Sequence, residues 1–433
     1  MLTIVNSKPA ISYLQSSEQQ TLIDKCISTN ALKVISRLKK ANFKAYLVGG
    51  AIRDILLGKH PKDFDVATDA TPEEIRKLFK NALIIGRRFQ IVHIRFGREI
   101  IEVTTFRGKH EPTETNKKSK VSAISKEGML LRDNVFGNME EDAERRDFSV
   151  NALYLDPDKG AIYDYHNGLK DLDDRALHLI GDPDTRFKED PVRVLRAARF
   201  VSKLDFTLDN DTIASMKAHA PLLHKISPSR LFDESLKLYN AGFGEKMFRT
   251  LCEFELLPYL LFDHKPLSDE QSLPRKLADC ALKNTDKRLS EGKSITPAFI
   301  YAVFLWPTVQ RLMDTHKAQD VPLFTAFHLA ATEAQTLQGQ LTHIPKRLQT
   351  AMREIWELQF RLTQTTPKKA ERTVTHPRFR AGYDFLLLRE EAGEIPTELG
   401  AFWTEYQKQH PLPEKPKKTY NTRKPRRRPN KPK

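Results

Sequence analysis

The chain has 433 residues, a formal net charge of +15 and three cysteines, and this length suggests two to four domains with a sizeable core. No apolar run is long enough to span a bilayer, and the first residues lack a basic-then-apolar leader, so we expect neither a transmembrane segment nor a secretory signal. Cys26, Cys252 and Cys280 are scattered without metal-ligand spacing, which predicts free thiols in a reducing compartment, and hence a cytoplasmic protein.

The N-terminal part of the chain alternates short apolar strands with helices. Residues 1–30 are expected to be a loosely held lead-in, and 31–155 to form a small head with a mixed sheet. A capping box, with Thr71 as N-cap, Pro72 at the first helical position and Glu74 at the third, begins the helix predicted over 71–79. The polar segment 108–131 is predicted to be functional or mobile. The expected strands are 45–48, 63–68, 82–86, 91–97, 99–106 and 150–156.

Helical patterns dominate from about residue 175 onward. We expect a helical neck over 156–260, a helical body over 261–405 and a disordered tail over 406–433, which gives an α+β class overall. Pro307 is expected to end or kink the helix that starts at 296. From residue 415 the tail has ten Lys or Arg and no acid, so it should be attracted to polyanions. The alternative is a solubilising terminus without a fixed partner.

Two aspartates separated by one residue, Asp63 and Asp65, follow a short strand, a double glycine and an arginine. Such carboxylates on a strand point to the same face, and Mg²⁺ prefers oxygen ligands. The double glycine, Gly49 and Gly50, lets backbone N–H groups come close to a phosphate. Either motif alone is more often an ordinary turn. Together, a metal site beside a phosphate cradle predicts phosphoryl or nucleotidyl transfer.

Further charged residues lie at the ends of the predicted strands. Glu102 alternates with apolar neighbours in 99–106, so it faces either the metal or the solvent. Arg146, just before the strand 150–156, has a planar fork suited to a triphosphate. Asp147 is either a third carboxylate or the residue that orients Arg146, and a surface charge cluster is the structural alternative. The third carboxylate is therefore Asp147 or Glu102.

The helix expected after residue 190 has a donor and an acceptor near its start. Arg193 and Arg196 lie three residues apart on the same helical face as Asp190. A carboxylate beside a guanidinium suits a base edge with an amino group next to a ring-nitrogen acceptor. Adenine and cytosine both have this edge, so the pair selects these two bases without distinguishing them. The structural alternative for Asp190 is a helix N-cap.

In this order, the segments GGAIRD, DFDVAT, RRDFSVNAL and EDPVRVLRAARF resemble the class II nucleotidyltransferase superfamily, which includes bacterial poly(A) polymerases and CCA-adding tRNA nucleotidyltransferases. The resemblance implies that Asp63 and Asp65 bind two catalytic Mg²⁺ ions and that Asp147 is a catalytic acid. It implies that Asp190 and Arg193 read the incoming base. The residues that match its nucleotide-binding positions are Gly49, Gly50, Arg53, Arg146, Asp190, Arg193 and Arg196.

The segment 83–97, the helical neck and body and the basic tail resemble the polymerase branch of this superfamily. The resemblance implies addition of AMP from ATP to RNA 3′ ends, which include mRNA, regulatory RNA and decay intermediates. Partners among RNA-decay proteins cannot be identified from sequence. One alternative is a CCA-adding enzyme with the same head chemistry. Another is an inactive RNA-binding adaptor, against which the intact aspartate pair argues. RNA contacts in the tail are expected from Lys417, Lys418, Arg423, Arg426, Arg427 and Arg428.

Overall fold

The computed structural model describes residues 9–13, 25–86, 89–108, 122–124 and 129–410. The chain divides into two compact units, residues 1–349 and 350–433. The expected boundary between neck and body at residue 260 therefore lies inside the first unit. Across the residues described, none of the helices combines the length and the apolar character needed to cross a bilayer.

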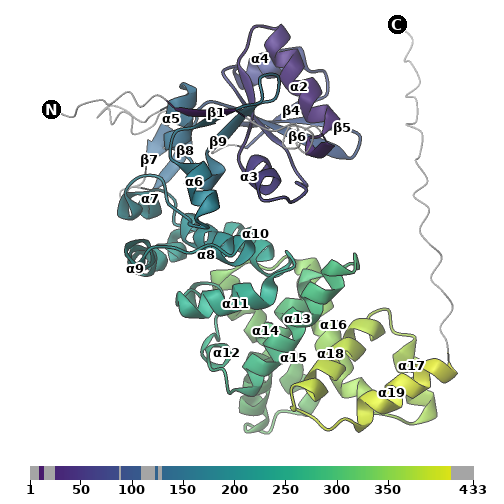
Figure 1. Ribbon diagram of the computed structural model, residues 1–433. Coiled ribbons are helices and arrows are strands. Elements are labelled where there is room, and N and C mark those ends of the chain that lie inside the picture. The colour runs from purple at the N-terminus through teal and green to yellow at the C-terminus, as the bar shows by residue number, and fades with distance from the viewer. Residues whose placement is uncertain (1–8, 14–24, 87–88, 109–121, 125–128, 411–433) are drawn as a thin grey trace, which may run out of the picture. The chain divides into compact units, whose positions relative to one another are not determined.

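Eight strands of the first unit form one mixed sheet, seen in the upper part of Figure 1. Neighbouring strands are antiparallel, except that β3 (Asp65–Thr68) and β6 (Glu99–Thr105) are parallel. The strand that carries Asp65, β3, lies in the interior of the sheet, between β2 (Ala45–Val48) and β6. In order across the sheet, the strands are β1 (Ala10–Tyr13), β10 (Ala161–Asp164), β9 (Leu153–Asp156), β2 (Ala45–Val48), β3 (Asp65–Thr68), β6 (Glu99–Thr105), β5 (Ile91–Phe96) and β4 (Ala82–Ile85).

The sheet is larger than the sequence predicted. Strand β10 pairs with β9 beyond the expected head boundary at residue 155, and β1 pairs with β10 from within the expected lead-in. The side chains of β1 are exposed, so this edge strand lacks the buried face that reveals a strand in sequence. Parts of the polar segment 108–131 also pair, since β7 (Ser122–Ile124) and β8 (Leu130–Asp133) form a separate two-stranded sheet. Residues 109–121 and 125–128 lie outside the described residues.

Short helices cover the sheet and set the loops around it. Helix α2 (Thr29–Lys40) packs against β2, β3 and β6, and α3 (Gly50–Leu56) packs against β2 and β9. Helix α4 (Pro72–Leu78) begins with the predicted capping box, in which Thr71 accepts from the backbone N–H of Glu74 and Glu74 caps Thr71 in return. Helix α5 (Met139–Glu144) starts with a second capping box at Asn138.

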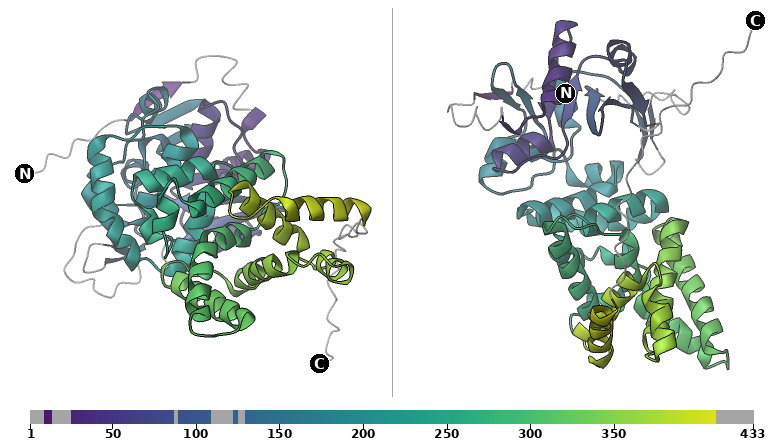
Figure 2. Two further views of the ribbon diagram at one scale, coloured as in Figure 1. Left: turned by 90° about the horizontal axis from the view of Figure 1, so that it is seen from below. Right: turned by 90° about the vertical axis from the view of Figure 1, so that its right-hand side faces the viewer.

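The remainder of the described chain is helical, which confirms the predicted α+β class. Within the first unit, α8 and α10 lie next to the head and α11 to α15 lie farther from it (Figures 1 and 2). The helices of this part are α6 (Gly168–Asp173), α7 (Pro183–Glu189), α8 (Val192–Leu204), α9 (Asn210–His219), α10 (Pro228–Tyr239), α11 (Gly244–Glu253), α12 (Lys265–Ser268), α13 (Leu273–Ser290), α14 (Pro297–Lys317) and α15 (Leu323–Leu341), and α16 (Lys346–Leu362) runs into the second unit.

Helix α14 does not end at Pro307, which lies inside it and is followed by ten more helical residues. A proline removes one backbone hydrogen bond from a helix. Here the residues on both sides of it, among them Phe304, Trp306 and Val309, are buried, and this packing offsets the lost bond.

The second unit has its own core around Trp403. Its indole is fully buried and donates a hydrogen bond of 2.8 Å to the carbonyl oxygen of Leu362. The buried side chains of this cluster are Leu358, Leu362, Ala370, Val374, Phe379, Tyr383, Leu386 and Trp403. They come from α16, α17 (Pro367–Val374), α18 (Phe379–Glu391) and α19 (Glu398–Gln409).

Candidate active site

The double glycine places backbone next to charged side chains. Gly49 precedes α3 with φ of +78°, a region that side chains other than glycine rarely adopt. A Cβ atom at Gly49 would lie 3.5 Å from Nη1 of Arg146 and 4.0 Å from Oδ2 of Asp65, and one at Gly50 would lie 3.3 Å from Nη2 of Arg53. The turn thus places backbone that carries no side chains next to the predicted carboxylate and two of the predicted arginines.

The carboxylates gather at the start of β3. Asp65 is the first residue of this strand and pairs in register with Glu102 on β6, so their side chains share one face of the sheet. Asp63 is exposed and precedes the strand, so strand alternation does not fix its direction as the sequence argument assumed. Glu102 also contacts His93 on β5, with 3.1 Å between Nε2 and Oε1.

The electrostatics of Asp65 reflect this crowding. Burial raises the pKa of Asp65 to about 6. The negative charges of Glu102 and Asp63 also raise this pKa, whereas the positive charge of Arg146 lowers it. Carboxylates that repel each other in this way form the donor set that a divalent cation neutralises. Although no three His, Cys, Asp or Glu side chains in the described part of the chain converge as a ready-made metal group, the donor chemistry here fits Mg²⁺.

Arg146 is held in place by a buried acid and a tyrosine. Its guanidinium donates to Oδ2 of Asp142, with Nη2 at 3.0 Å, and to the hydroxyl of Tyr154, with Nε at 2.9 Å. Burial opposes its charge, but Tyr154 and Asp142 outweigh that effect and raise the pKa of Arg146. The residue that orients Arg146 is therefore Asp142, and the alternative that assigned this role to Asp147 is wrong.

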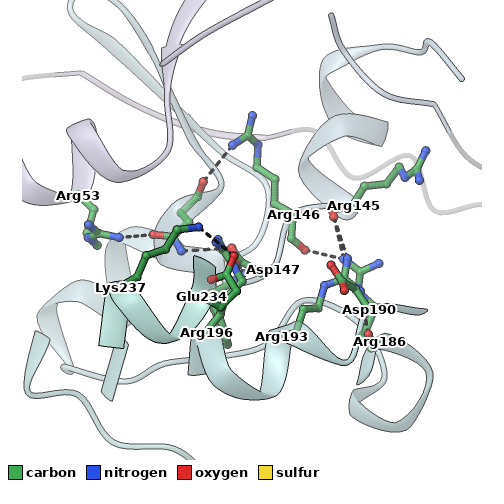
Figure 3. A network of polar contacts seen from close by, with 12 residues as sticks. Arg53, Arg145, Arg146, Asp147, Arg186, Asp190, Arg193, Arg196, Glu234 and Lys237 are labelled. Atoms are coloured by element: carbon green, nitrogen blue, oxygen red, sulfur yellow. Dashed lines mark hydrogen bonds and ion pairs between the residues drawn. The ribbon is translucent and has the colours of Figure 1, made fainter. Parts of the chain in front are cut away.

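Asp147 instead joins the head to helix α8. Its Oδ2 accepts from Arg196, with Nε at 2.7 Å, while its Oδ1 accepts from the backbone N–H of Phe148 at 2.9 Å and from Asn151 at 3.2 Å. Burial acts to raise the pKa of Asp147, but Arg196 and these hydrogen bonds lower it to about 2. The carboxylate is thus ionised and committed to Arg196 (Figure 3).

Arg53 and Arg146 are linked through Asn151. Nη1 of Arg53 donates to the Asn151 side-chain oxygen at 2.5 Å, and Nη1 of Arg146 lies 3.5 Å from the Asn151 carbonyl oxygen. Arg53 is also held by Asp54, with Nη2 2.6 Å from Oδ1. Sequence reasoning did not single out Asn151, although it lies within the segment RRDFSVNAL and is a buried polar residue.

The predicted base-reading pair lies at the start of α8. Asp190 does not cap this helix with its side chain, since α8 has no side-chain cap. Its two carboxylate oxygens lie 3.0 and 2.9 Å from Nη2 of Arg230 on α10. Nη1 of Arg193 donates to the carbonyl oxygen of Arg186 at 2.8 Å and to Glu189 at 3.0 Å. Both side chains therefore have defined hydrogen-bond partners, and Figure 3 shows Asp190 and Arg193 close to Arg186.

Arg186 supports this arrangement from α7. Its Nη2 donates to the carbonyl oxygens of Arg145 and Arg146 at 2.8 and 2.6 Å, so it fixes the turn that carries the predicted arginine and aspartate. Neither Arg186 nor Arg230 was predicted, because their partners are 40 or more residues away in sequence. Some predicted residues lie outside the described part of the chain. They are the tail residues expected to bind RNA, Lys417, Lys418, Arg423, Arg426, Arg427 and Arg428, and the arginines at 87 and 88 within the segment 83–97.

Three protein families match the chain. They are described as "Poly A polymerase head domain" over residues 45–178, "Probable RNA and SrmB- binding site of polymerase A" over 205–267 and "Polymerase A arginine-rich C-terminus" over 319–433. The first covers the glycine turn, the carboxylates of β3 and β6 and the segment that contains Arg146 and Asp147. The helix with Asp190 and Arg193 lies between the first and second matches.

Whole proteins and solved structures give concordant likenesses. Poly(A) polymerase I of Escherichia coli O6:H1 is 43% identical over 95% of this chain and 91% of its own length, and that of Haemophilus influenzae is 44% identical over 91% and 90%. A CCA-adding enzyme of Streptococcus suis is 36% identical over 53% of this chain and 54% of its own.

Among solved structures, a CCA-adding enzyme in its apo form II has a TM-score of 0.61 at 18% identity over 92% of this chain and 86% of that one. A CCA-adding enzyme complexed with ATP has a TM-score of 0.59 at 17% identity over 92% and 85%. These likenesses establish the fold, and the poly(A) polymerase I relatives, which span nearly the whole chain, establish the family. The chain belongs to the poly(A) polymerase I family.

Proposed function

We propose that the chain transfers AMP from ATP to the 3′-hydroxyl of RNA and releases pyrophosphate, acting as a polynucleotide adenylyltransferase. The observation that carries this function is that two groups of site residues lie in one unit: the glycine turn and carboxylates of the head, and the residues at the start of α8. The Asp147–Arg196 ion pair connects the head, with its glycine turn and carboxylates, to the helix that presents Asp190 and Arg193. A nucleotide bound across this junction would have its phosphates at the head and its base at α8.

The phosphate end of the site is cationic and preorganised. Arg53 and Arg146 are fixed by Asp54, Asn151 and Asp142, so their guanidinium forks need little reordering when a triphosphate arrives. Fixed cations of this kind stabilise the negative charge that shifts onto the leaving pyrophosphate. The open backbone at the glycine turn lets the phosphates come close.

Asp63 and Asp65 are the residues that would hold Mg²⁺, and Glu102 is the neighbouring carboxylate in register with Asp65. When bound, a pair of Mg²⁺ ions supplies Lewis acidity at the attacking 3′-oxygen and at the triphosphate. Asp147 is committed to Arg196, which favours Glu102 as the third carboxylate. In this reading Asp147 acts by positioning Arg196.

The base end of the site favours an amino group beside a ring nitrogen. A carboxylate has about four lone-pair positions, so Asp190 retains acceptor capacity while Arg230 holds it. The Asp190–Arg193 pair suits adenine and cytosine alike. The choice of ATP over CTP then depends on the shape of the pocket around the pair, to which Arg230, Glu189 and Arg186 contribute by fixing the two side chains.

The acceptor would be an RNA 3′ end, from mRNA, regulatory RNA or decay intermediates, held mainly through its phosphates. The helical body and the basic tail are the proposed holding surfaces. None of the described residues Cys26, Cys252 and Cys280 forms a disulfide, which supports a cytoplasmic location. CCA addition shares the head chemistry, but the CCA-adding enzyme of Streptococcus suis matches 53% of the chain in sequence, whereas poly(A) polymerase I of Escherichia coli O6:H1 matches 95% of it.

The test is an assay of single nucleotides. The protein is incubated with a generic RNA and Mg²⁺ and each of the four NTPs separately, and the products are resolved on a gel. Long tails with ATP alone are expected, and CTP should give little product. A second incubation uses tRNA with CTP and ATP together, and addition restricted to two cytidines and one adenosine there would support the CCA-adding alternative. Binding of RNA without any addition would indicate an inactive adaptor.

A further inference from the structure

The segment 83–97, which resembles the polymerase branch, contains a histidine that the proposed mechanism does not use. This residue, His93, lies within β5. Its neighbours along the strand, Val92 and Ile94, are fully buried, and successive side chains of a strand point to opposite faces of the sheet. His93 therefore lies on the other face, where the hydrophobic core of the head does not require an imidazole.

His93 belongs to a row of three polar side chains that crosses three neighbouring strands. Asp65 on β3 pairs in register with Glu102 on β6, and Glu102 pairs in register with His93 on β5. Side chains of residues paired in this way lie next to each other on one face of a sheet. Glu102 thus has the aspartate on one side and the histidine on the other.

The histidine holds one of the two carboxylate oxygens of Glu102. Nε2 of His93 lies 3.1 Å from Oε1 of Glu102, and Nε2 is the donor because a carboxylate can only accept. The neighbour of His93 on its other side is Leu83 on β4, which is apolar. Among the described residues, Glu102 is therefore the polar partner of the imidazole, and Oε2 of Glu102 accepts no hydrogen bond.

Glu102 needs such a partner because its place beside Asp65 is unfavourable for a carboxylate that is free to move. The negative charge of Glu102 acts to raise the pKa of Asp65, so the two carboxylates repel each other when no cation lies between them. The side chain of Glu102 is 45% exposed and that of His93 only 18%. An exposed glutamate can turn into solvent through many rotamers, and the hydrogen bond from the less mobile imidazole restricts that motion.

We propose that His93 is a positioning residue of the metal site. It holds Oε1 of Glu102 through Nε2–H and leaves Oε2 available to the cation that Asp63 and Asp65 would bind. Carboxylates that ligate a metal are themselves held by hydrogen bonds from residues that do not touch it. This inference rests on the proposed function for the identity of the metal site, but it concerns metal binding and needs neither ATP nor turnover to be tested.

The experiment compares substitutions of His93 that remove the donor with one that keeps it. His93→Leu and His93→Val remove it, and valine also suits a strand, whereas His93→Gln places an amide N–H within reach of Glu102. The matched control is His316→Leu on α14. Nε2 of His316 lies 3.4 Å from Oε2 of Glu333 on α15, and these two side chains are 22% and 46% exposed, so a similar pair is broken outside the head.

Each full-length protein is titrated with Mn²⁺ in a calorimeter without nucleotide or RNA, and thermal unfolding in EDTA confirms that it is folded. We expect His93→Leu and His93→Val to bind Mn²⁺ about tenfold more weakly than wild type, which is the lower end of the loss caused by substituting a partner of a metal ligand. His93→Gln should recover most of this loss, and His316→Leu should bind Mn²⁺ as wild type does.

A double variant decides whether His93 acts through Glu102. Glu102→Gln alone should weaken Mn²⁺ binding, and adding His93→Leu should weaken it little further, because residues that act as a unit are not additive. If His93→Leu caused the same loss in the Glu102→Gln background as in wild type, the histidine would act by another route and the proposal would be wrong.

Mn²⁺ affinities of both His93→Leu and His93→Val within about twofold of wild type would also overturn the proposal, since the pair would then only tie β5 to β6. The outcome is separable from the proposed function. A wild-type protein that tails RNA, with His93 variants that bind Mn²⁺ normally, refutes only the positioning role. A wild-type protein that binds Mn²⁺ but never adds AMP, with His93→Leu binding more weakly, refutes only the polymerase function.

Discussion

The guanidinium of Arg196 binds the carboxylate of Asp147 across the junction between α8 and the head, with 2.7 Å between Nε and Oδ2. The resemblance to nucleotidyltransferases assigned these residues separately, one to the nucleotide and the other to catalysis. Their pairing gives them a shared task. It aligns α8, which carries Arg193 and is preceded by Asp190, with the carboxylates of the head.

Replacing Asp147 by Asn should reduce stability at neutral pH by about 2 kcal/mol, since the folded state lowers the pKa of Asp147 by nearly two units, to about 2. A lowered pKa stabilises the fold above the unfolded value near 3.8, and this stabilisation is lost as the pH falls toward 2. Urea unfolding of wild type and Asp147→Asn at pH 7, 4 and 2.5 measures it. The difference should shrink as the pH falls, and a constant difference would contradict the assigned charge.

Much of the head could be predicted because its signals are local. The capping box at Thr71, the strand 45–48 and the glycine turn each depend on residues a few positions apart. Strand β1 was missed because all of its side chains are exposed. Strand β10 was not predicted, although the short turn at 157–160 links it directly to its antiparallel neighbour β9.

The candidate site shows the same division. The spacing of Asp63, Asp65, Asp190 and Arg193 indicated the chemistry. The partners of these residues did not follow from sequence, because Arg230 reaches Asp190 from 40 residues away and only the tertiary fold brings them together. Patterning identifies which groups act, whereas long-range packing decides what holds them.

Asp63→Ala or Asp65→Ala should abolish nucleotide addition and leave the fold intact. Since the pKa of Asp65 is raised to about 6, the metal-free fold loses stability as the pH rises from the ordinary value near 3.8, and this loss is complete above about 6. Removal of Asp65 should therefore not lower the unfolding midpoint at pH 7.5 in EDTA. Tailing with ATP and Mg²⁺ is measured beside thermal unfolding. Asp211→Ala, at an exposed position in the first turn of α9, is the control. Wild-type rates of nucleotide addition in either active-site variant would contradict the assignment of that residue to the metal site.

Glu102→Gln tests which residue is the third carboxylate. If Glu102 contributes to the metal site, its amide variant should lose at least a hundredfold in kcat and weaken Mn²⁺ binding measured by titration calorimetry. Asp147→Asn should leave Mn²⁺ binding unchanged, because its carboxylate contacts Arg196. The opposite pattern would transfer the role to Asp147.

Removal of residues 415–433 should weaken RNA binding and leave ATP binding unchanged. This segment carries ten Lys or Arg and no acid. For every RNA phosphate that the shortened chain no longer binds, the slope of log K against log salt should fall by about 0.7 for single-stranded RNA. Binding is measured between low and physiological salt with the full and the shortened chain, and an equal slope would show that the tail only aids solubility.

Arg230→Gln should weaken the selection of adenine over uracil, although Arg230 contacts Asp190 and not the base. Nη2 of Arg230 lies within 3.0 Å of both oxygens of Asp190, so its loss lets the acceptor turn away from the exocyclic amine of adenine. A site that uses buried hydrogen bonds discriminates strongly, because the wrong base leaves polar groups unpaired. We therefore expect the ratio of kcat/KM for ATP over UTP to fall about tenfold, equivalent to roughly 1.4 kcal/mol.

The double variant decides whether Arg230 acts through Asp190. Asp190→Ala alone should lower the ATP:UTP ratio, and adding Arg230→Gln should lower it little further, because residues that act as a unit are not additive. Arg249→Gln, an exposed position on α11 paired with Glu245, should leave the ratio unchanged. If Arg230→Gln keeps the wild-type ratio while Asp190→Ala does not, the ion pair only ties α10 to α8. If both keep it, the base is read by other residues.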